Sequence, residues 1–258
     1  MRIARYEYRG AVRFGVIDPG AGTIRELDRS PFEGGRPTGV EMPLEQVSLL
    51  APVSPGKIVA VGLNYRDHAK EVGMVIPQEP LLFLKAPTAV IGPGAEIVYP
   101  RQSRRVDYEA ELAVVIGRRA KGVTARDAAA HVLGYTCFND VTARDLQVKD
   151  IQFARSKGFD TFAPMGPWIE TELDPSALGV RCLVNGELRQ DGNTREMGAG
   201  VPRLLEYISA NMTLLPGDVI ATGTPPGVGS LKAGDLVTVE IEGIGALTNR
   251  VAAPEGVR

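Results

Sequence analysis

Residues 106–116 constrain the fold most, because an acidic beginning runs directly into an apolar stretch that reads as a β-strand. Side chains alternate between the two faces of a strand, so Glu109 and Glu111 are expected to point the same way and could hold one ion together. The same face continues as Ala113 and Val115, which is typical of a cavity wall. The alternative is the solvated face of an edge strand.

A third carboxylate follows a second apolar stretch. Residues 132–138 predict a strand that ends at Asn139 and Asp140, immediately before a predicted helix over residues 141–147. Ligands often bind at strand ends in proteins built on sheets. Asn and Asp are also common helix caps, and that role is the alternative for this pair.

Glu109, Glu111 and Asp140 together form a candidate metal site. Carboxylate oxygens favour a hard cation, so Mg²⁺ or Mn²⁺ is expected over Zn²⁺, which prefers His and Cys. Without a cation, three clustered carboxylates would repel one another and raise their pKa values.

A polar segment follows the apolar residues 58–61 and contains one of the two histidines of the chain. On a helical turn, His68 and Glu71 are three residues apart and face each other. A histidine oriented by a carboxylate can take a proton from water near neutral pH, whereas an incidental surface ion pair is the alternative. The other histidine, His131, follows three alanines on a predicted helix and is interpreted as a surface or packing residue.

Gly73 suits a helix end, and residues 74–80 contain two prolines, which predicts an irregular segment. We hypothesise that residues 73–80 close over the site as a lid. A plain surface loop is the alternative.

Two further segments are candidate substrate contacts. Lys157 lies beside a glycine in a predicted loop rich in aromatic residues and could hold a substrate carboxylate, although a solvated lysine is the alternative. Residues 222–229 read Thr-Gly-Thr-Pro-Pro-Gly-Val-Gly, similar to a loop that binds an anion. This segment matches neither the P-loop nor the dinucleotide fingerprint, and a turn between strands explains it equally well.

Six stretches, in one order over about residues 56 to 250, resemble the fumarylacetoacetate hydrolase family, particularly its short acylpyruvase-like branch. They are Gly62-Leu63-Asn64-Tyr65 through Glu71, Asp107-Tyr108-Glu109-Ala110-Glu111-Leu112, Gly134-Tyr135 through Asn139-Asp140 with Ala143-Arg144-Asp145-Leu146-Gln147, Lys157-Gly158-Phe159-Asp160-Thr161, Val184-Asn185-Gly186-Glu187, and Thr222-Gly223-Thr224-Pro225.

The resemblance implies a role for each candidate residue. Glu109, Glu111 and Asp140 would hold Mg²⁺ or Mn²⁺, and His68 with Glu71 would activate water. Lys157 would stabilise the negative charge that develops on the substrate. Gln147 and Thr224 would contact oxygen atoms of the substrate.

The implied substrate is a small 2-oxo or 2,4-dioxo acid, and three reactions share the metal, an enolate and a proton shuttle. We expect carbon–carbon cleavage, either hydrolysis of an acylpyruvate or decarboxylation of oxaloacetate. The alternative is a 2-hydroxyhepta-2,4-diene-1,7-dioate isomerase or 5-oxopent-3-ene-1,2,5-tricarboxylate decarboxylase of aromatic catabolism. A further alternative is a metal- or ligand-binding relative without turnover.

Composition is that of an ordinary globular chain: 258 residues, 44% hydrophobic, with a net charge of −2. It suggests no nucleic-acid partner, and no apolar run approaches the length of a membrane span. Cys137 and Cys182 lie in apolar segments without Cys-x-x-Cys spacing, so we expect buried free thiols in a reducing cytoplasm. The amino terminus lacks the apolar core of a signal peptide.

Two domains are expected, a small β lobe over residues 1–53 and a catalytic domain over residues 54–258, joined at Ser54-Pro55-Gly56. Strands are expected to dominate, so the fold class is mixed α/β but mainly β. They include residues 11–17, 113–116, 181–184 and 236–241. One helix is indicated by a stripe of Met197, Val201, Leu204, Leu205 and Ile208. The resemblance implies a β-sheet roll with the site at its mouth, and a homodimer.

Overall fold

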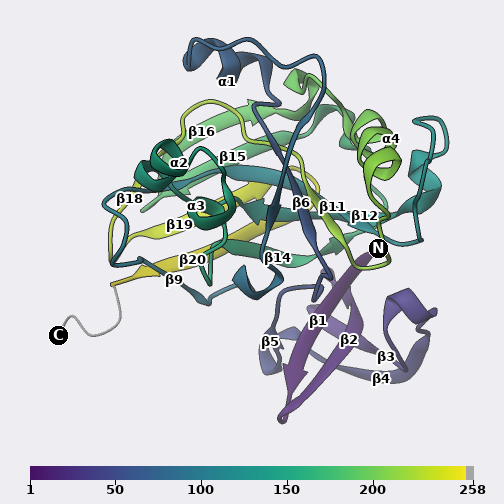
Figure 1. Cartoon of the computed structure of the whole chain (residues 1–258). Helices are drawn as coiled ribbons and strands as arrows, with labels where there is room; N and C mark the ends of the chain where they lie inside the picture. The colour runs from purple at the N-terminus through teal and green to yellow at the C-terminus, as the bar shows by residue number, and fades with distance from the viewer. Residues whose placement is uncertain (254–258) are drawn as a thin grey trace.

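Three β-sheets make up most of the computed structural model, which describes residues 1–253, and short helices lie around them (Figure 1). The mainly β fold that the sequence predicts is confirmed. The sheets contain twelve, five and three strands.

The large sheet has the order β4 (Pro37–Pro43), β3 (Thr23–Leu27), β2 (Ala11–Asp18), β1 (Arg2–Tyr8), β14 (Ala163–Glu170), β12 (Val132–Asn139), β11 (Ala110–Ile116), β17 (Val219–Ala221), β6 (Ile58–Gly62) and β7 (Leu81–Lys85). Off this path, β5 (Ser48–Leu49) pairs with β1, and β8 (Val90–Ile91) pairs with β14. The five-stranded sheet has the order β16 (Glu187–Asn193), β15 (Gly179–Val184), β19 (Leu236–Ile241), β20 (Gly245–Ala252) and β9 (Glu96–Val98). The smallest sheet consists of β13 (Thr142–Ala143), β10 (Val106–Tyr108) and β18 (Gly229–Leu231).

The α-helices are α1 (Arg66–Glu71), α2 (Arg144–Asp150), α3 (Ala154–Lys157) and α4 (Val201–Asn211). Short 3₁₀ helices are η1 (Pro31–Glu33), η2 (Leu44–Gln46), η3 (Pro87–Ala89), η4 (Ala128–His131), η5 (Pro175–Ala177) and η6 (Thr194–Glu196). The apolar stripe predicted for α4 is buried, although Met197 lies before the helix and forms a β-bridge with Tyr65.

The central strand β11 is buried on both faces, because its residues alternate between two hydrophobic clusters. Leu112, Val114 and Ile116 pack in one cluster, whereas Ala113 and Val115 pack in the other. This alternation agrees with the period of two that the sequence indicates. Packing on both faces fixes β11 in the core, and with it Glu111 near the start of the strand, which belongs to the site described below.

Strands β1 to β5 form the lobe at the bottom of Figure 1. The lobe has a hydrophobic cluster of its own, which includes Tyr6, Ile17 and Ile24. It nevertheless shares a sheet with the rest of the chain, because β1 pairs with β14 through Arg2–Glu170 and Ile3–Ile169. The division into two domains at residues 53 and 54 stays a prediction.

Four local expectations need correction. The strand expected over residues 106–116 is interrupted at Glu109, and the helix expected over residues 141–147 begins only at Arg144. Asn139 is no cap of α2, because it ends β12 and its Oδ1 accepts the Glu109 N–H at 3.0 Å. Lys157 lies at the end of the short helix α3 instead of in a loop.

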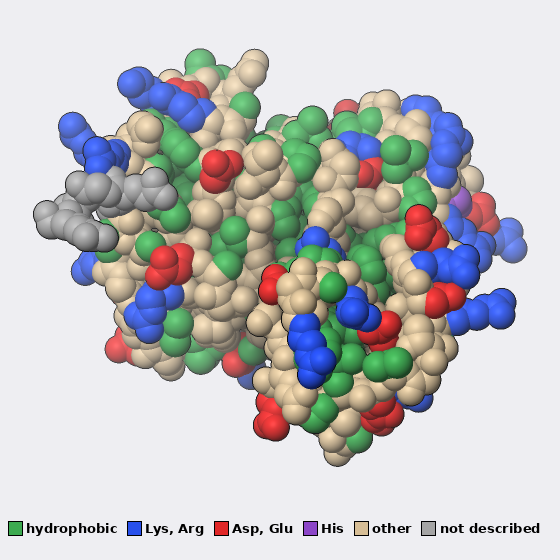
Figure 2. Space-filling view, turned by 90° about the horizontal axis from the view of Figure 1, so that it is seen from below, with side chains coloured by type: hydrophobic (Ala, Val, Ile, Leu, Met, Phe, Trp, Pro, Cys, Tyr) green, Lys and Arg blue, Asp and Glu red, His purple; other side chains and the backbone are tan. Residues whose placement is uncertain are grey.

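The described surface mixes charges of both signs. Seen from below, basic and acidic side chains are interspersed over the lobe and the body around it (Figure 2). Within residues 1–253, no helix is long and apolar enough to cross a membrane. Cys137 and Cys182 are buried and free, as expected, and burial raises the pKa of the Cys137 thiol to about 12.

Candidate active site

The antiparallel pairing of β11 with β12 brings the three candidate carboxylates together. In this register Ala110 lies opposite Asn139, so the start of β11 meets the end of β12. The Asp140 N–H donates to the Glu109 carbonyl at 2.9 Å. One oxygen each from Glu109, Glu111 and Asp140 lies within 4.8 Å of the others, and all three residues are buried.

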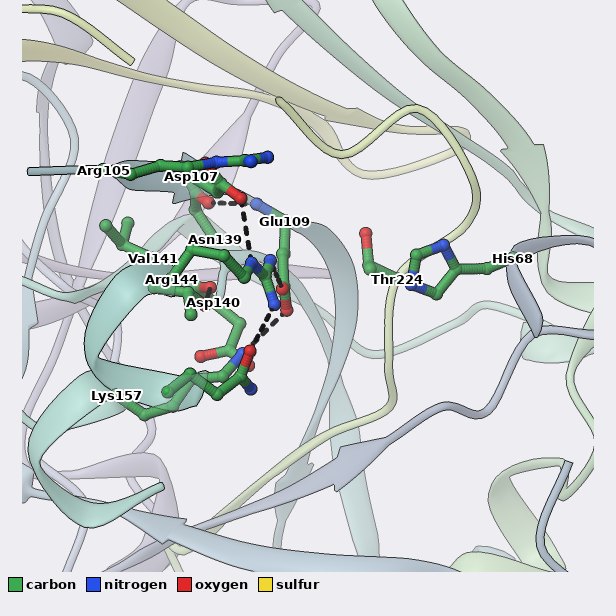
Figure 3. Close-up of polar contacts among 12 residues, drawn as sticks. His68, Arg105, Asp107, Glu109, Asn139, Asp140, Val141, Arg144, Lys157 and Thr224 are labelled. Atoms are coloured by element: carbon green, nitrogen blue, oxygen red, sulfur yellow. Dashed lines mark hydrogen bonds and ion pairs between the residues drawn. The ribbon is translucent and has the colours of Figure 1, made fainter. Parts of the chain in front are cut away.

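Two lysines and an arginine form ion pairs with Glu109 and Asp140, and Figure 3 shows Lys157 and Arg144 beside them. Lys157 Nζ donates to Glu109 Oε2 at 2.8 Å and also to Asp140 Oδ2. Lys85 Nζ, at the end of β7, donates to Asp140 Oδ1 at 2.6 Å. Arg144 donates to Glu109 Oε1. Lys157 is therefore a buried partner of two carboxylates, and the alternative of a solvated lysine is wrong.

Arg144 and Lys85 were not singled out from the sequence. Arg144 lies one helical turn before Gln147, and its Nη1 donates to Gln147 Oε1 at 2.6 Å. That spacing of three residues on a predicted helix was a usable signal. Lys85 ends an apolar stretch, Leu81 to Leu84, but nothing in this local pattern names a partner 55 residues away.

The electrostatic environments of Glu109 and Glu111 differ. Burial alone would raise the pKa of Glu109, but Lys157 and Arg144 outweigh it and hold the pKa at about 2. Glu111 forms no ion pair with any Lys or Arg of residues 1–253, and its Oε2 accepts the Gly223 N–H at 2.9 Å. Burial, followed by the charges of Asp140 and Glu109, raises the pKa of Glu111 well above its usual range.

A divalent cation fits this donor set. The three side chains offer hard oxygen ligands close together, and Glu111 is a buried carboxylate beside two others without a cationic partner of its own. A metal ion would supply the missing positive charge.

The proposed water-activating dyad lies on α1, just after β6. His68 Nδ1 is 2.9 Å from Glu71 Oε2, so the two side chains face each other as the spacing predicts. Glu71 Oε1 also accepts the Gly227 N–H at 3.0 Å. This second contact ties the carboxylate to the loop that follows β17. Since Nδ1 is engaged, Nε2 is the ring nitrogen left to meet a water molecule.

The segment over residues 222–229 connects β17 with β18, and its amides contact carboxylates of the protein itself. Gly223 donates to Glu111, and Gly227 donates to Glu71. The Thr224 hydroxyl donates to the Ala110 carbonyl at 2.9 Å and accepts from Gln190 Nε2 at 2.8 Å. The loop therefore braces both the acidic cluster and the dyad. Thr224 and His68 line one cavity.

A cavity of about 310 Å³ joins these groups. Seven of the eight candidate residues line it: His68, Glu109, Glu111, Asp140, Gln147, Lys157 and Thr224. The eighth, Glu71, contacts it through His68. A larger groove of about 710 Å³ lies elsewhere, along Arg2, Trp168 and residues 240–246, away from the acidic cluster. Its greater size does not make it the better candidate, because reactive groups gather in the smaller cavity.

Asn64 holds three segments around this cavity in place. Its Nδ2 donates to the Thr222 carbonyl at 2.8 Å and to the Ala199 carbonyl at 3.0 Å, and its Oδ1 accepts the Ala199 N–H at 2.9 Å. All three bonds cross more than a hundred residues of sequence. Asn64 therefore links the start of α1 to the loop that contacts the dyad.

Comparison with known proteins identifies a family over most of the chain. Residues 57–252 match the family described as Fumarylacetoacetate (FAA) hydrolase C-terminal, and residues 1–52 match Rv2993c-like, N-terminal. The chain is 47% identical to the human mitochondrial oxaloacetate tautomerase FAHD2A, covering 81% of this chain and 71% of that protein.

Two solved structures are similar over nearly the whole length. The 5-carboxymethyl-2-hydroxymuconate delta-isomerase of Mycobacterium smegmatis is 47% identical, with a TM-score of 0.93, covering 98% of this chain and 100% of that one. The maleylpyruvate hydrolase of Sphingobium sp. SYK-6, solved with manganese(II) and pyruvate, is 32% identical, with a TM-score of 0.82, covering 99% of this chain and 100% of that one. The chain belongs to the fumarylacetoacetate hydrolase family.

Proposed function

We propose that this protein is a Mg²⁺- or Mn²⁺-dependent enzyme that cleaves a carbon–carbon bond in a 2-oxo or 2,4-dioxo acid, with hydrolysis of an acylpyruvate as its main reaction. One observation carries the proposal: His68 of the dyad lines the same cavity as the three clustered carboxylates. That arrangement offers a base for water beside a site for a cation that binds the substrate.

Glu109, Glu111 and Asp140 would hold the cation. When bound, a divalent cation supplies Lewis-acid polarisation of the substrate's adjacent oxygens and stabilises the negative charge that develops on them. Lys157 and Arg144 lie around the same carboxylates and add positive charge at this end of the cavity. The 2-oxo acid end of a substrate therefore belongs here.

The residues of the chain supply the proton transfers. His68 Nε2 takes a proton from water, and Glu71 stabilises the imidazolium through Nδ1. The water oxygen then bonds to the carbonyl carbon at C4. The C3–C4 bond breaks, and its electron pair passes to C3 as the enolate of pyruvate. A proton returned to C3 by His68 completes the balance: an acylpyruvate and water give a carboxylic acid and pyruvate.

Two relatives support this chemistry. The maleylpyruvate hydrolase of Sphingobium was solved with manganese(II) and pyruvate, the same metal class and product that the proposal names. Oxaloacetate tautomerase FAHD2A, by its name, acts on a 2-oxo acid. The similarity to the Mycobacterium smegmatis isomerase favours isomerisation of an unsaturated hydroxy-diacid as the second candidate. In that reaction the dyad would move a proton between carbons without attack by water.

A substrate panel tests the proposal. Pyruvate release is followed from acetylpyruvate, fumarylpyruvate and oxaloacetate, and the ultraviolet absorbance of a hydroxy-dienedioate is followed in parallel, each with Mg²⁺ or Mn²⁺ and then with a chelator. The proposal expects metal-dependent pyruvate from an acylpyruvate. An ultraviolet change with no pyruvate from any substrate would replace hydrolysis by isomerisation.

Residues 73–80 bear on access to the site. They form no helix or strand, and Met74, Val75 and Pro77 line the cavity. Gly73 has φ +68°, the left-handed backbone that a glycine adopts readily after a helix. Closure of this segment as a lid and assembly of the chain as a homodimer both stay predictions.

A further inference from the structure

The positive charge of the cavity is gathered at one end. Among the lining residues that the structure describes, Lys157 and Arg144 are the Lys and Arg side chains. Both are ion-paired with Glu109, and Lys157 also with Asp140. The remaining nitrogens of Arg144 donate to Asp107 Oδ2 at 2.9 Å and to Gln147 Oε1 at 2.6 Å. Every guanidinium nitrogen of Arg144 therefore has a partner.

The wall next to His68 is apolar instead. The Val72 N–H donates to the His68 carbonyl at 3.1 Å, so Val72 lies one helical turn beyond the base. Met74 and Val75 continue this wall, and all three side chains line the cavity. Their exposed fractions are 47%, 60% and 87%, which is high for large apolar side chains. The wall offers apolar area that a ligand would cover.

Orientation of the substrate follows from these two ends and rests on the proposed function. The 2-oxo acid end lies at the carboxylates, and His68 must reach water beside the distal carbonyl carbon. Whatever is attached beyond that carbon meets the side chains that follow His68, namely Val72, Met74 and Val75.

We propose that this wall receives an uncharged, apolar acyl tail, so that the enzyme selects acylpyruvates ending in an alkyl group over those ending in a second carboxylate. Covering apolar side chains with an alkyl tail is favourable, because it removes apolar surface from water. A terminal carboxylate in the same place would lose water without gaining a cationic partner.

A matched pair of substrates isolates the tail. Butanoylpyruvate and succinylpyruvate have seven carbons each and differ only in a terminal methyl group or carboxylate. We expect kcat/KM for butanoylpyruvate to exceed that for succinylpyruvate at least about tenfold with Mn²⁺. Equal values, or a preference for succinylpyruvate, would overturn the proposal.

Charge placed on the wall should reverse the preference. Met74→Lys and Val75→Lys supply the missing cation, so kcat/KM for succinylpyruvate should rise relative to butanoylpyruvate. Val40→Lys is the matched control, because Val40 is an exposed apolar residue of β4 in the lobe and lines no part of this cavity. It adds the same charge to the protein and should leave the ratio unchanged. A ratio that moves equally in all three variants would contradict a local effect of the wall.

A binding measurement separates this proposal from the proposed function. 2-Oxohexanoate and 2-oxohexanedioate lack the carbonyl that would be attacked, and they differ in the terminal carboxylate alone. Their dissociation constants, measured by calorimetry with Mn²⁺, should favour 2-oxohexanoate in the unmodified protein and shift toward 2-oxohexanedioate in Met74→Lys. If neither dioxo acid is hydrolysed but this order of affinity holds, hydrolysis is wrong and the apolar tail site stands. If hydrolysis occurs but the order is absent, the tail site is wrong.

Discussion

His68 Nδ1 lies 2.9 Å from Glu71 Oε2, and the other oxygen of Glu71 accepts the Gly227 N–H at 3.0 Å. The dyad is thus held from two sides, by α1 and by the loop after β17. The same loop donates from Gly223 to Glu111 of the acidic cluster. One loop therefore sets the position of the base relative to the candidate metal ligands.

Replacing the base should separate metal binding from turnover. His68→Gln removes the proton acceptor and leaves the three carboxylates untouched, so kcat for acylpyruvate hydrolysis should fall by about 10²- to 10⁴-fold. Steady-state kinetics and Mn²⁺ calorimetry measure the two properties. His131→Gln is the control, because His131 lies on η4 and contacts the Arg119 carbonyl instead of the cavity. Activity retained in His68→Gln would remove His68 from the mechanism.

The two glutamates should differ in their effect on stability without metal. Glu109→Gln removes one of the two carboxylates that pair with each of Lys157 and Arg144, which keep Asp140 and Asp107, and we expect the free energy of unfolding to fall by about 2 kcal/mol. Glu111→Gln removes a carboxylate that has two like-charged neighbours and no ion pair among residues 1–253, so stability should stay the same or increase.

Urea denaturation in the presence of a chelator measures both variants, and Mn²⁺ calorimetry should show weakened metal binding in each. Equal losses of stability would contradict the asymmetry between the two sites. Full Mn²⁺ affinity in either variant would contradict its role as a ligand.

Metal binding should release protons at mildly acidic pH. In the metal-free protein the raised pKa of Glu111 keeps that carboxyl protonated at a pH where a free carboxyl is ionised. A cation requires the ionised form, so its affinity should rise with pH through the range between the usual and the raised pKa. Glu109, whose pKa is about 2, is already ionised there and releases nothing. Calorimetry in two buffers of different ionisation enthalpy counts the protons, and identical heats in both would refute the linkage.

Asn64 should matter for stability through its three long-range hydrogen bonds. Asn64→Ala leaves the Thr222 and Ala199 backbone groups without partners, and we expect a loss of about 1 to 3 kcal/mol in the free energy of unfolding. Asn211→Ala is the matched control, because its exposed side chain donates to the Tyr207 carbonyl within the same helix, α4. The control should change stability by less than about 0.5 kcal/mol. Similar values for the two variants would show that Asn64 does not brace the loops.

Local spacing predicted the parts of the site that belong to one element. The contact between His68 and Glu71 follows from three residues on a helical turn, and Glu111 follows from alternation along β11. The interruption of the strand at Glu109 was not predictable in this way, because it depends on Asn139, which is 30 residues away.

The cationic partners were harder to predict for the same reason. Lys85 reaches Asp140 although β11, β17 and β6 lie between β12 and β7 in the sheet, so no local sequence pattern contains this contact. Lys157 was a candidate substrate contact from its local sequence, with a solvated side chain as the alternative, and neither reading predicted its ion pairs with Glu109 and Asp140. Burial of a lysine depends on the carboxylates it meets, and these come from other strands.

Acetylpyruvate incubated with the protein and Mn²⁺, with the products followed by NMR, tests the central claim most directly. The account predicts one acetate and one pyruvate for each acetylpyruvate consumed, with the reaction abolished by a chelator and by His68→Gln. Consumption that continues unchanged in the chelator, or no acetate from a protein that binds Mn²⁺, would contradict metal-dependent hydrolysis at this site.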